Sequence, residues 1–103
     1  MLHKPSSVPG GRAPHCEIEI NGKRLSTLDL FTDKFILFLA PDCKIDIIQS
    51  MLPIPKEYSL ICYQLYKDFT DVKQDFMSLY QIAKYNAVLV RPDGHIAWRI
   101  RIN

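Results

Sequence analysis

Three cysteines, Cys16, Cys43 and Cys62, are the most nucleophilic side chains in this 103-residue sequence, and their spacing limits their chemistry. None belongs to a C-x-x-C pair of the kind that holds zinc or forms a redox disulfide. Cys43 follows Asp42 at the expected start of a helix, where the helix dipole lowers a thiol pKa. It has no partner cysteine three residues away, and the Asp42 carboxylate opposes thiolate formation. We interpret Cys43 as structural and keep a reactive thiol as the alternative.

The histidines and one charged turn are the next candidates for chemistry. His3, His15 and His95 have no spacing typical of a metal site. His15 has no carboxylate or nucleophile at a catalytic spacing, so we expect it to form a structural hydrogen bond. Arg91 and Asp93 flank a proline in a predicted turn, where contact between their side chains would stabilise the turn.

The aromatic side chains are interpreted as packing residues. Trp98 falls on the last predicted strand and is expected in the core or at an interface. Tyr58, Tyr63 and Tyr66 are expected to pack their rings and direct their hydroxyls to the surface. The sequence therefore predicts no catalytic residue, no cofactor-binding residue and no metal ligand.

Composition indicates one small globular domain. Thirteen basic and eleven acidic residues give a net charge of +2, and the basic residues are scattered rather than concentrated as nucleic-acid binding requires. The longest apolar run, residues 35–40, is far shorter than the roughly 20 residues of a membrane span. Residues 1–14 contain no apolar segment typical of a signal peptide. We expect a cytoplasmic protein that binds neither nucleic acid nor membrane.

The first half of the chain predicts an arm, a hairpin and a buried strand. Residues 1–14 are rich in proline and glycine, so a flexible arm is expected there. Residues 17–20 alternate between polar and apolar, and Asn21-Gly22 then predicts a tight hairpin turn. Residues 34–40 are apolar almost throughout, which is typical of a strand that is covered on both faces.

The second half predicts two helices, a strand and a closing hairpin. A helix is expected from an Asp42 N-cap, with apolar residues at helical spacing as far as Pro53. Residues 58–66 read as a strand, and Thr70 or Asp71 begins a second helix, residues 71–84. Two strands, residues 87–90 and 95–100, flank the turn sequence Arg-Pro-Asp-Gly. The order is typical of an α/β fold with a mixed sheet.

Three motifs resemble one protein family. They are Pro-Gly-Gly-Arg-Ala-Pro-His at residues 9–15, Ser-Thr-Leu-Asp-Leu-Phe at 26–31, and Ala-Val-Leu-Val-Arg-Pro-Asp-Gly-His-Ile-Ala-Trp-Arg at 87–99. Together they resemble the C-terminal domain of FAD-dependent aromatic-ring hydroxylases, the flavin monooxygenases of the phenol hydroxylase and para-hydroxybenzoate hydroxylase class. The resemblance implies a thioredoxin-like domain over residues 15–103, with a central mixed sheet and flanking helices.

Two departures from the family qualify this implication. Family members carry a G-x-G-x-x-G segment that holds FAD at a helix N-terminus, and this sequence has none. FAD and NAD(P)H are therefore expected only in the full-length enzymes. The usual C-terminal helix is also absent from these residues, so one sheet face is expected to lack its cover.

The last strand then leads to an expectation about assembly. Ile96, Trp98, Ile100 and Ile102 are spaced by two and are expected on one exposed face. Such an apolar patch favours a homodimer or a complex with a flavoprotein subunit.

Three functional hypotheses remain open, two from the resemblance and one from the position of Cys43. The first is a detached or remnant module that acts in subunit or domain association and is not catalytic alone. The second is one subunit of a split flavin monooxygenase, which docks onto a separate FAD-binding chain. The third, from a different class, is a redox protein that uses the thiol of Cys43. The sequence does not indicate which aromatic compound the related enzymes hydroxylate.

Overall fold

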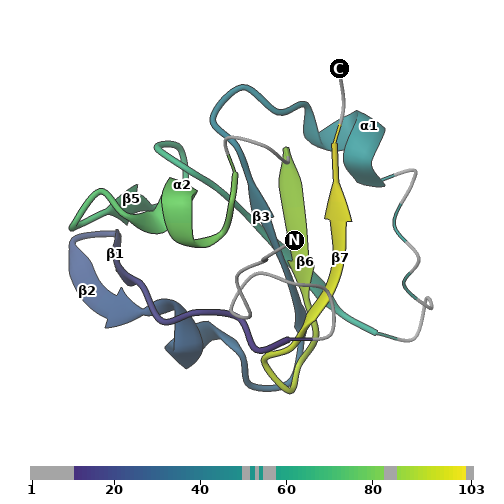
Figure 1. The fold of residues 1–103 in the computed structure, drawn as a ribbon, viewed down its shortest axis with the longest axis horizontal. Helices are drawn as coiled ribbons and strands as arrows, with labels where there is room; N and C mark the ends of the chain where they lie inside the picture. Colours follow the sequence, from purple (N-terminus) through teal and green to yellow (C-terminus); the bar gives the residue numbers. More distant parts are fainter. Residues whose placement is uncertain (1–10, 50–51, 53, 55–57, 83–85, 102–103) are drawn as a thin grey trace, which may run out of the picture.

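The fold is mostly β and consists of two sheets, of which one is mixed (Figure 1). The computed structural model describes residues 11–49, 52, 54, 58–82 and 86–101. The smaller sheet has the strand order β2-β1-β5 and the larger has the order β4-β3-β6-β7. The helices within these residues are short, and none is long and apolar enough to cross a membrane.

The smaller sheet is built on the predicted N-terminal hairpin, which is confirmed. β1 (Glu17–Ile20) pairs antiparallel with β2 (Lys23–Ser26). Asn21 and Gly22 both have positive φ, 53° and 81°, as a two-residue turn between twisted strands requires. β5 (Thr70–Asp71) pairs with the other edge of β1.

The larger sheet contains the buried centre of the molecule. β3 (Phe35–Leu39) runs parallel to β4 (Leu60–Gln64) and antiparallel to β6 (Ala87–Val90). β7 (Ile96–Ile100) completes the sheet as the antiparallel neighbour of β6. β6 is buried along its whole length and β3 along all but its first residue, as their apolar sequences predict.

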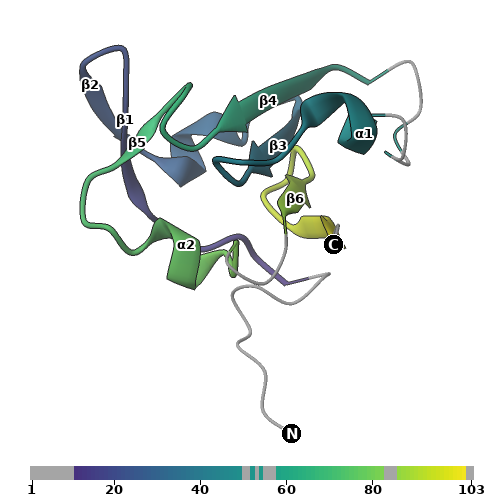
Figure 2. The same cartoon turned by 90° about the horizontal axis from the view of Figure 1, so that it is seen from above.

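Short helices lie on opposite sides of the larger sheet (Figure 2). One is α1 (Ile45–Gln49), and the buried side chain of its Ile48 belongs to the core. The other is α2 (Phe76–Leu79), which supplies an aromatic cluster over β3. The Phe38 ring lies 5.2 Å from that of Phe76 and 5.1 Å from that of Tyr80. Phe76 and Tyr80 stack with ring centroids 4.5 Å apart. These rings and the Ile48 side chain of α1 belong to one hydrophobic core.

The second predicted helix is largely wrong. Thr70 and Asp71 form β5 rather than the start of a helix, because their backbone pairs with β1. α2 spans only Phe76–Leu79, and a positive φ of 56° at Gln81 ends the helical geometry. Residues 83 and 84, at the end of the predicted helix, lie outside the described residues.

The first predicted helix and the strand after it are shifted at their ends. α1 begins at Ile45, since Cys43 donates its amide to the carbonyl of Ala40 in a turn before the helix. The expected N-cap at Asp42 is therefore wrong, and Pro53 lies outside the described residues. The strand predicted over residues 58–66 is confirmed only for Leu60–Gln64.

A bulge changes the expected orientation of side chains on β7. Leu89 pairs with Trp98, and Val90 pairs with Ile96, so Ala97 is an extra residue in β7. Paired residues share a face, whereas Leu89 and Val90 point to opposite faces. Ile96 therefore points away from the face of Trp98.

The predicted apolar patch on β7 is consequently wrong. Ile96 is fully buried and Ile100 is 3% exposed, because the two residues pack on different faces of the sheet within this chain. Trp98 is half-buried, and Ile102 lies outside the described residues. Self-association stays a prediction, with Trp98 as its remaining support.

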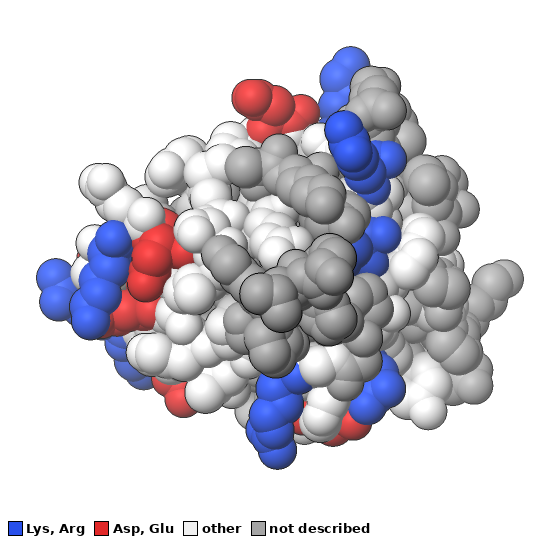
Figure 3. Space-filling view, viewed as in Figure 1, with Lys and Arg blue, Asp and Glu red and all other residues white. Residues whose placement is uncertain are grey.

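Charge on the molecular surface is mixed. On the face shown in Figure 3, basic and acidic side chains alternate around the rim and do not gather into one patch. This distribution agrees with the small net charge of +2.

Candidate functional site

The three sequence motifs meet at one end of the molecule, at the lower edge of Figure 1. We call residues 11–15, 26–31 and 91–95 the junction end. The arm joins the turn before β7 through two backbone bonds of 2.8 Å, from Ala13 N to Gly94 O and from Ile96 N to Gly11 O. Arg12 and His95 form an antiparallel bridge between the same segments. Segments about 80 residues apart in sequence thus lie side by side.

The carbonyl of Pro14 links the arm to two distant parts of the chain. It accepts hydrogen bonds from the hydroxyl of Thr27, at 2.9 Å, and from that of Tyr80, at 2.6 Å. The Thr27 hydroxyl also accepts the amide of Cys16 at 3.0 Å. Burial raises the pKa of Tyr80 far above its usual value, so its hydroxyl stays protonated and remains a donor. Neither Thr27 nor Tyr80 carries a local sequence signal for this role.

His15 forms the structural hydrogen bond expected for it. Its Nδ1 lies 2.6 Å from the Ser26 hydroxyl. Ser26 caps the 3-10 helix η2 (Thr27–Leu30), because its hydroxyl accepts the Leu28 amide at 3.0 Å. The Asp29 carboxylate accepts the Ser26 amide at 2.9 Å, which completes a capping box. The imidazole is exposed and serves this cap.

The turn between β6 and β7 is fixed by the expected contact of its charged residues. Arg91 donates to both carboxylate oxygens of Asp93, at 3.1 and 2.7 Å. Asp93 also accepts the amide of His95 at 3.1 Å. Hydrogen bonds from Arg91 hold the pKa of the Asp93 carboxyl well below its usual range. Gly94 has a φ of 86°, and a Cβ there would lie 3.7 Å from the ring of Phe31.

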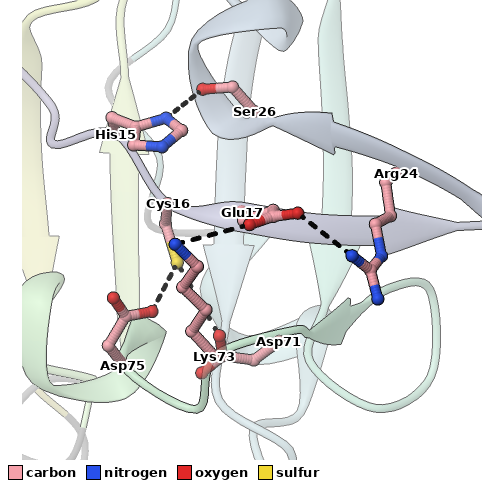
Figure 4. Close-up of polar contacts among 8 residues, drawn as sticks. All are labelled: His15, Cys16, Glu17, Arg24, Ser26, Asp71, Lys73 and Asp75. Carbon is pink, nitrogen blue, oxygen red and sulfur yellow. Dashed lines mark hydrogen bonds and ion pairs between the residues drawn. The ribbon is translucent and has the colours of Figure 1, made fainter.

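A thiol and two carboxylates meet beside the arm, as Figure 4 shows. The Cys16 sulfur, 1% exposed, lies 3.3 Å from Asp75 Oδ1 and 3.8 Å from Asp71 Oδ1. Burial and the two carboxylates raise the thiol pKa far above its usual value. Cys16 therefore remains a hydrogen-bond donor to Asp75, and a metal ion would first have to displace the thiol proton. More than 50 residues separate Cys16 from both carboxylates, so the sequence did not indicate this cluster.

Ion pairs flank this cluster. Lys73 and Arg24 both reach Glu17, at 3.7 and 3.5 Å (Figure 4). Both basic side chains are mostly exposed, so these pairs contribute little to stability.

Comparison with known proteins places all three motifs within one matched family domain. The family model for the aromatic-ring hydroxylase C-terminal domain matches residues 6–102. The chain belongs to this family. Its matching region includes the junction end, the thiol cluster and both sheets.

The curated relatives of this chain are much longer proteins. Aklavinone 12-hydroxylase RdmE of Streptomyces purpurascens is 38% identical over 97 residues, covering 92% of this chain and 18% of the relative. Tetracenomycin A2 monooxygenase-dioxygenase of Streptomyces glaucescens is 32% identical, with 94% of this chain and 18% of the relative covered. The chain therefore spans about a fifth of the length of these relatives.

Solved structures of the same family share the fold. A ternary complex of aklavinone-11 hydroxylase with FAD and aklavinone matches with a TM-score of 0.77 and 32% identity, over 95% of this chain and 19% of that chain. The flavin-dependent monooxygenase PieE, in complex with FAD and substrate, matches with a TM-score of 0.72 and 29% identity, over 97% of this chain and 18% of that chain.

Cys43 of this chain has none of the features of an activated thiol. The residue is buried and lies two positions before α1. Burial raises its pKa, contrary to the lowering expected at a helix start. The side-chain amide nitrogen of Gln64, Nε2, donates to the backbone carbonyls of Cys43, Pro41 and Ala40, at 2.8, 3.0 and 3.0 Å. These bonds hold the turn around Cys43 closed.

The remaining candidate residues are spread over the domain. Tyr58 packs edge-on against Phe35, with ring centroids 5.5 Å apart. Tyr63 lies 6.4 Å from the Phe38 ring, so both tyrosines have packing roles. His3 lies outside the described residues.

Tyr66 differs from the other tyrosines. It is 64% exposed, has a φ of 71° and borders a cavity of about 230 Å³ that is also lined by Glu19, Lys67 and Asp68. That volume is below the roughly 300–1,000 Å³ of sites that enclose drug-sized ligands.

Proposed function

We propose that this chain is the C-terminal association module of an FAD-dependent aromatic-ring hydroxylase and carries no step of the chemistry itself. The observation that carries the proposal is its match to about 18% of the length of such enzymes, through a family model of their C-terminal region. Polar groups at the junction end support the proposal, because they bond to one another in caps and turns. Those bonds build a rigid surface rather than a reaction centre.

We infer that the larger sheet is the core of a thioredoxin-like fold. Its support is the parallel pair β3 and β4, with the antiparallel β6–β7 hairpin beside β3 and with α1 and α2 on opposite faces. The extra sheet formed by β1, β2 and β5 places the arm against α2.

The proposal applies to two arrangements of the hydroxylase. In one, a flavin-binding portion precedes this module in a single polypeptide, as the coverage of the relatives suggests. In the other, the flavin-binding portion is a separate subunit that the module docks onto. A thiol-dependent redox function for Cys43 has no comparable support, because the thiol is buried and its pKa is raised.

A domain exchange tests the proposed function. In RdmE, the segment that matches this chain is replaced by this chain, and a second form lacks the segment altogether. We expect the chimera to retain FAD and hydroxylate aklavinone, whereas the truncated form loses both properties. Full activity of the truncated form, or a chimera as inactive as that form, would contradict the proposal.

A further inference from the structure

We propose that the junction end is the surface through which this chain contacts the flavin-binding portion of the hydroxylase, with Leu28 as its apolar contact. This inference rests on the proposed function and adds the location of the interface. The partner at this surface is a folded protein surface that carries the flavin site.

The position at which the chain enters the domain indicates which partner contacts the junction end. The bonds of Gly11 and Ala13 to the turn before β7 fix the arm there, so any polypeptide that precedes residue 11 reaches the domain at the junction end. The matched relatives are about five times longer, and the matched region is their C-terminal domain. In those relatives, most of the polypeptide thus precedes the segment that corresponds to residue 11 and enters the domain at this surface.

Leu28 provides an apolar group at this surface. It is 48% exposed, and among the described residues only Tyr58 and Tyr66 are large apolar side chains of comparable exposure. Tyr58 packs against Phe35, and Tyr66, between β4 and β5, shares a cavity with the β1–β2 turn. Leu28 is therefore the member of this group at the junction end. One exposed leucine is ordinary by itself, but Leu28 lies beside the arm, where the chain enters the domain.

The surroundings of Leu28 match the composition of a protein interface. Exposed Arg12 and Asp29 lie on the same segments and carry opposite charges, and exposed His15 adds a polar ring. An apolar contact with a mixed polar rim is typical of protein partners, whereas nucleic acid selects a basic face.

The surface is also held rigid before any contact. The capping box at Ser26 fixes the backbone of Leu28, and the bidentate pair of Arg91 with Asp93 fixes the neighbouring turn. A preorganised surface loses little conformational entropy on association. Rigid presentation therefore favours a stable contact.

Hydroxyl-radical footprinting tests the location. The probe is applied to the full isolated chain and to the chimera in which this chain replaces the matching segment of RdmE. We expect several-fold lower labelling of Leu28 in the chimera and equal labelling of Tyr66 in the two samples. Equal labelling of Leu28 in a chimera that holds FAD and hydroxylates aklavinone would overturn the location and leave the proposed function intact. A chimera without FAD or activity would overturn both.

A matched pair of variants provides the second measurement. Leu28→Glu and Tyr66→Glu each add one charge at an exposed position of the isolated chain and should leave its urea midpoint unchanged. In the chimera, Leu28→Glu should lower FAD retention and aklavinone hydroxylation several-fold, and Tyr66→Glu should leave both unchanged. Equal behaviour of the two variants in the chimera would overturn the location of the interface.

Discussion

The Pro14 carbonyl shows how single residues hold the arm to the domain. Its two hydroxyl donors, Thr27 and Tyr80, are both fully buried and come from different parts of the chain. A buried acceptor that loses one of its two donors keeps the other hydrogen bond, so it is not left unsatisfied. The arm should therefore loosen by a measurable but limited amount when one donor is removed.

Tyr80→Phe tests this bond while keeping the aromatic ring. We expect the free energy of unfolding to fall by about 1 kcal/mol, the usual net value of one buried hydrogen bond. Urea denaturation measures the change, and Tyr58→Phe, on a ring that is 51% exposed, is the control. Equal midpoints for the two variants would show that the bond to Pro14 does not stabilise the fold.

Cys16 gives the fold a predictable response to alkaline pH. Its thiol pKa is raised in the folded state above the reference value of 9.0. The resulting stability is complete below that value and declines as the pH rises above it, because the unfolded chain then loses the thiol proton first. Cys16→Ser keeps a donor for Asp75 but does not ionise.

We therefore expect Cys16→Ser to flatten the alkaline decline in the urea midpoint between pH 8 and pH 10.5. Cys62→Ser, at a half-buried position, controls for the loss of any thiol. The slope is the readout, because the substitution also changes absolute stability. Identical slopes for the wild-type chain and Cys16→Ser would show that the Cys16 thiol does not cause the alkaline decline.

At the scale of elements, the closing hairpin depends on the backbone of its turn. Gly94 has a φ of 86°. A Cβ added there would lie 3.7 Å from the ring of Phe31, which is an ordinary van der Waals contact. Gly94→Ala should therefore lose about 1 kcal/mol of stability through backbone strain rather than collision.

Gly22→Ala is the matched variant for this measurement, since Gly22 has a φ of 81° and open space around it. The two variants should lose similar amounts in urea denaturation. A much larger loss for Gly94→Ala would mean that contact with Phe31, and not the turn, controls the position.

Elements with local signals were predictable, and elements made by distant pairing were not. Asn21-Gly22 encodes its hairpin within the turn itself, and the apolar run of β3 encodes its burial. Thr70 and Asp71 become a strand only because β1 lies beside them, about 50 residues away in sequence. The same non-local dependence hid the bulge at Ala97 and the cluster around Cys16.

At the scale of the whole molecule, the three motifs were visible in sequence but their convergence was not. Each motif reads as a separate turn or cap, and the contacts between His15 and Ser26 and between Arg12 and His95 join them. The family relationship was predictable because the motifs keep their order. The junction end could be identified only from the folded structure.

The central claim, that this chain acts as an association module and not as a flavoenzyme, is tested most directly on the isolated chain. Four glycines occur in the sequence, and none forms the G-x-G-x-x-G segment that holds a dinucleotide at a helix N-terminus. We predict that the purified chain, mixed with FAD and gel-filtered, emerges colourless and does not oxidise NADPH in the presence of phenols. Recovery of stoichiometric FAD with the chain, or NADPH oxidation that depends on a phenol, would contradict the account.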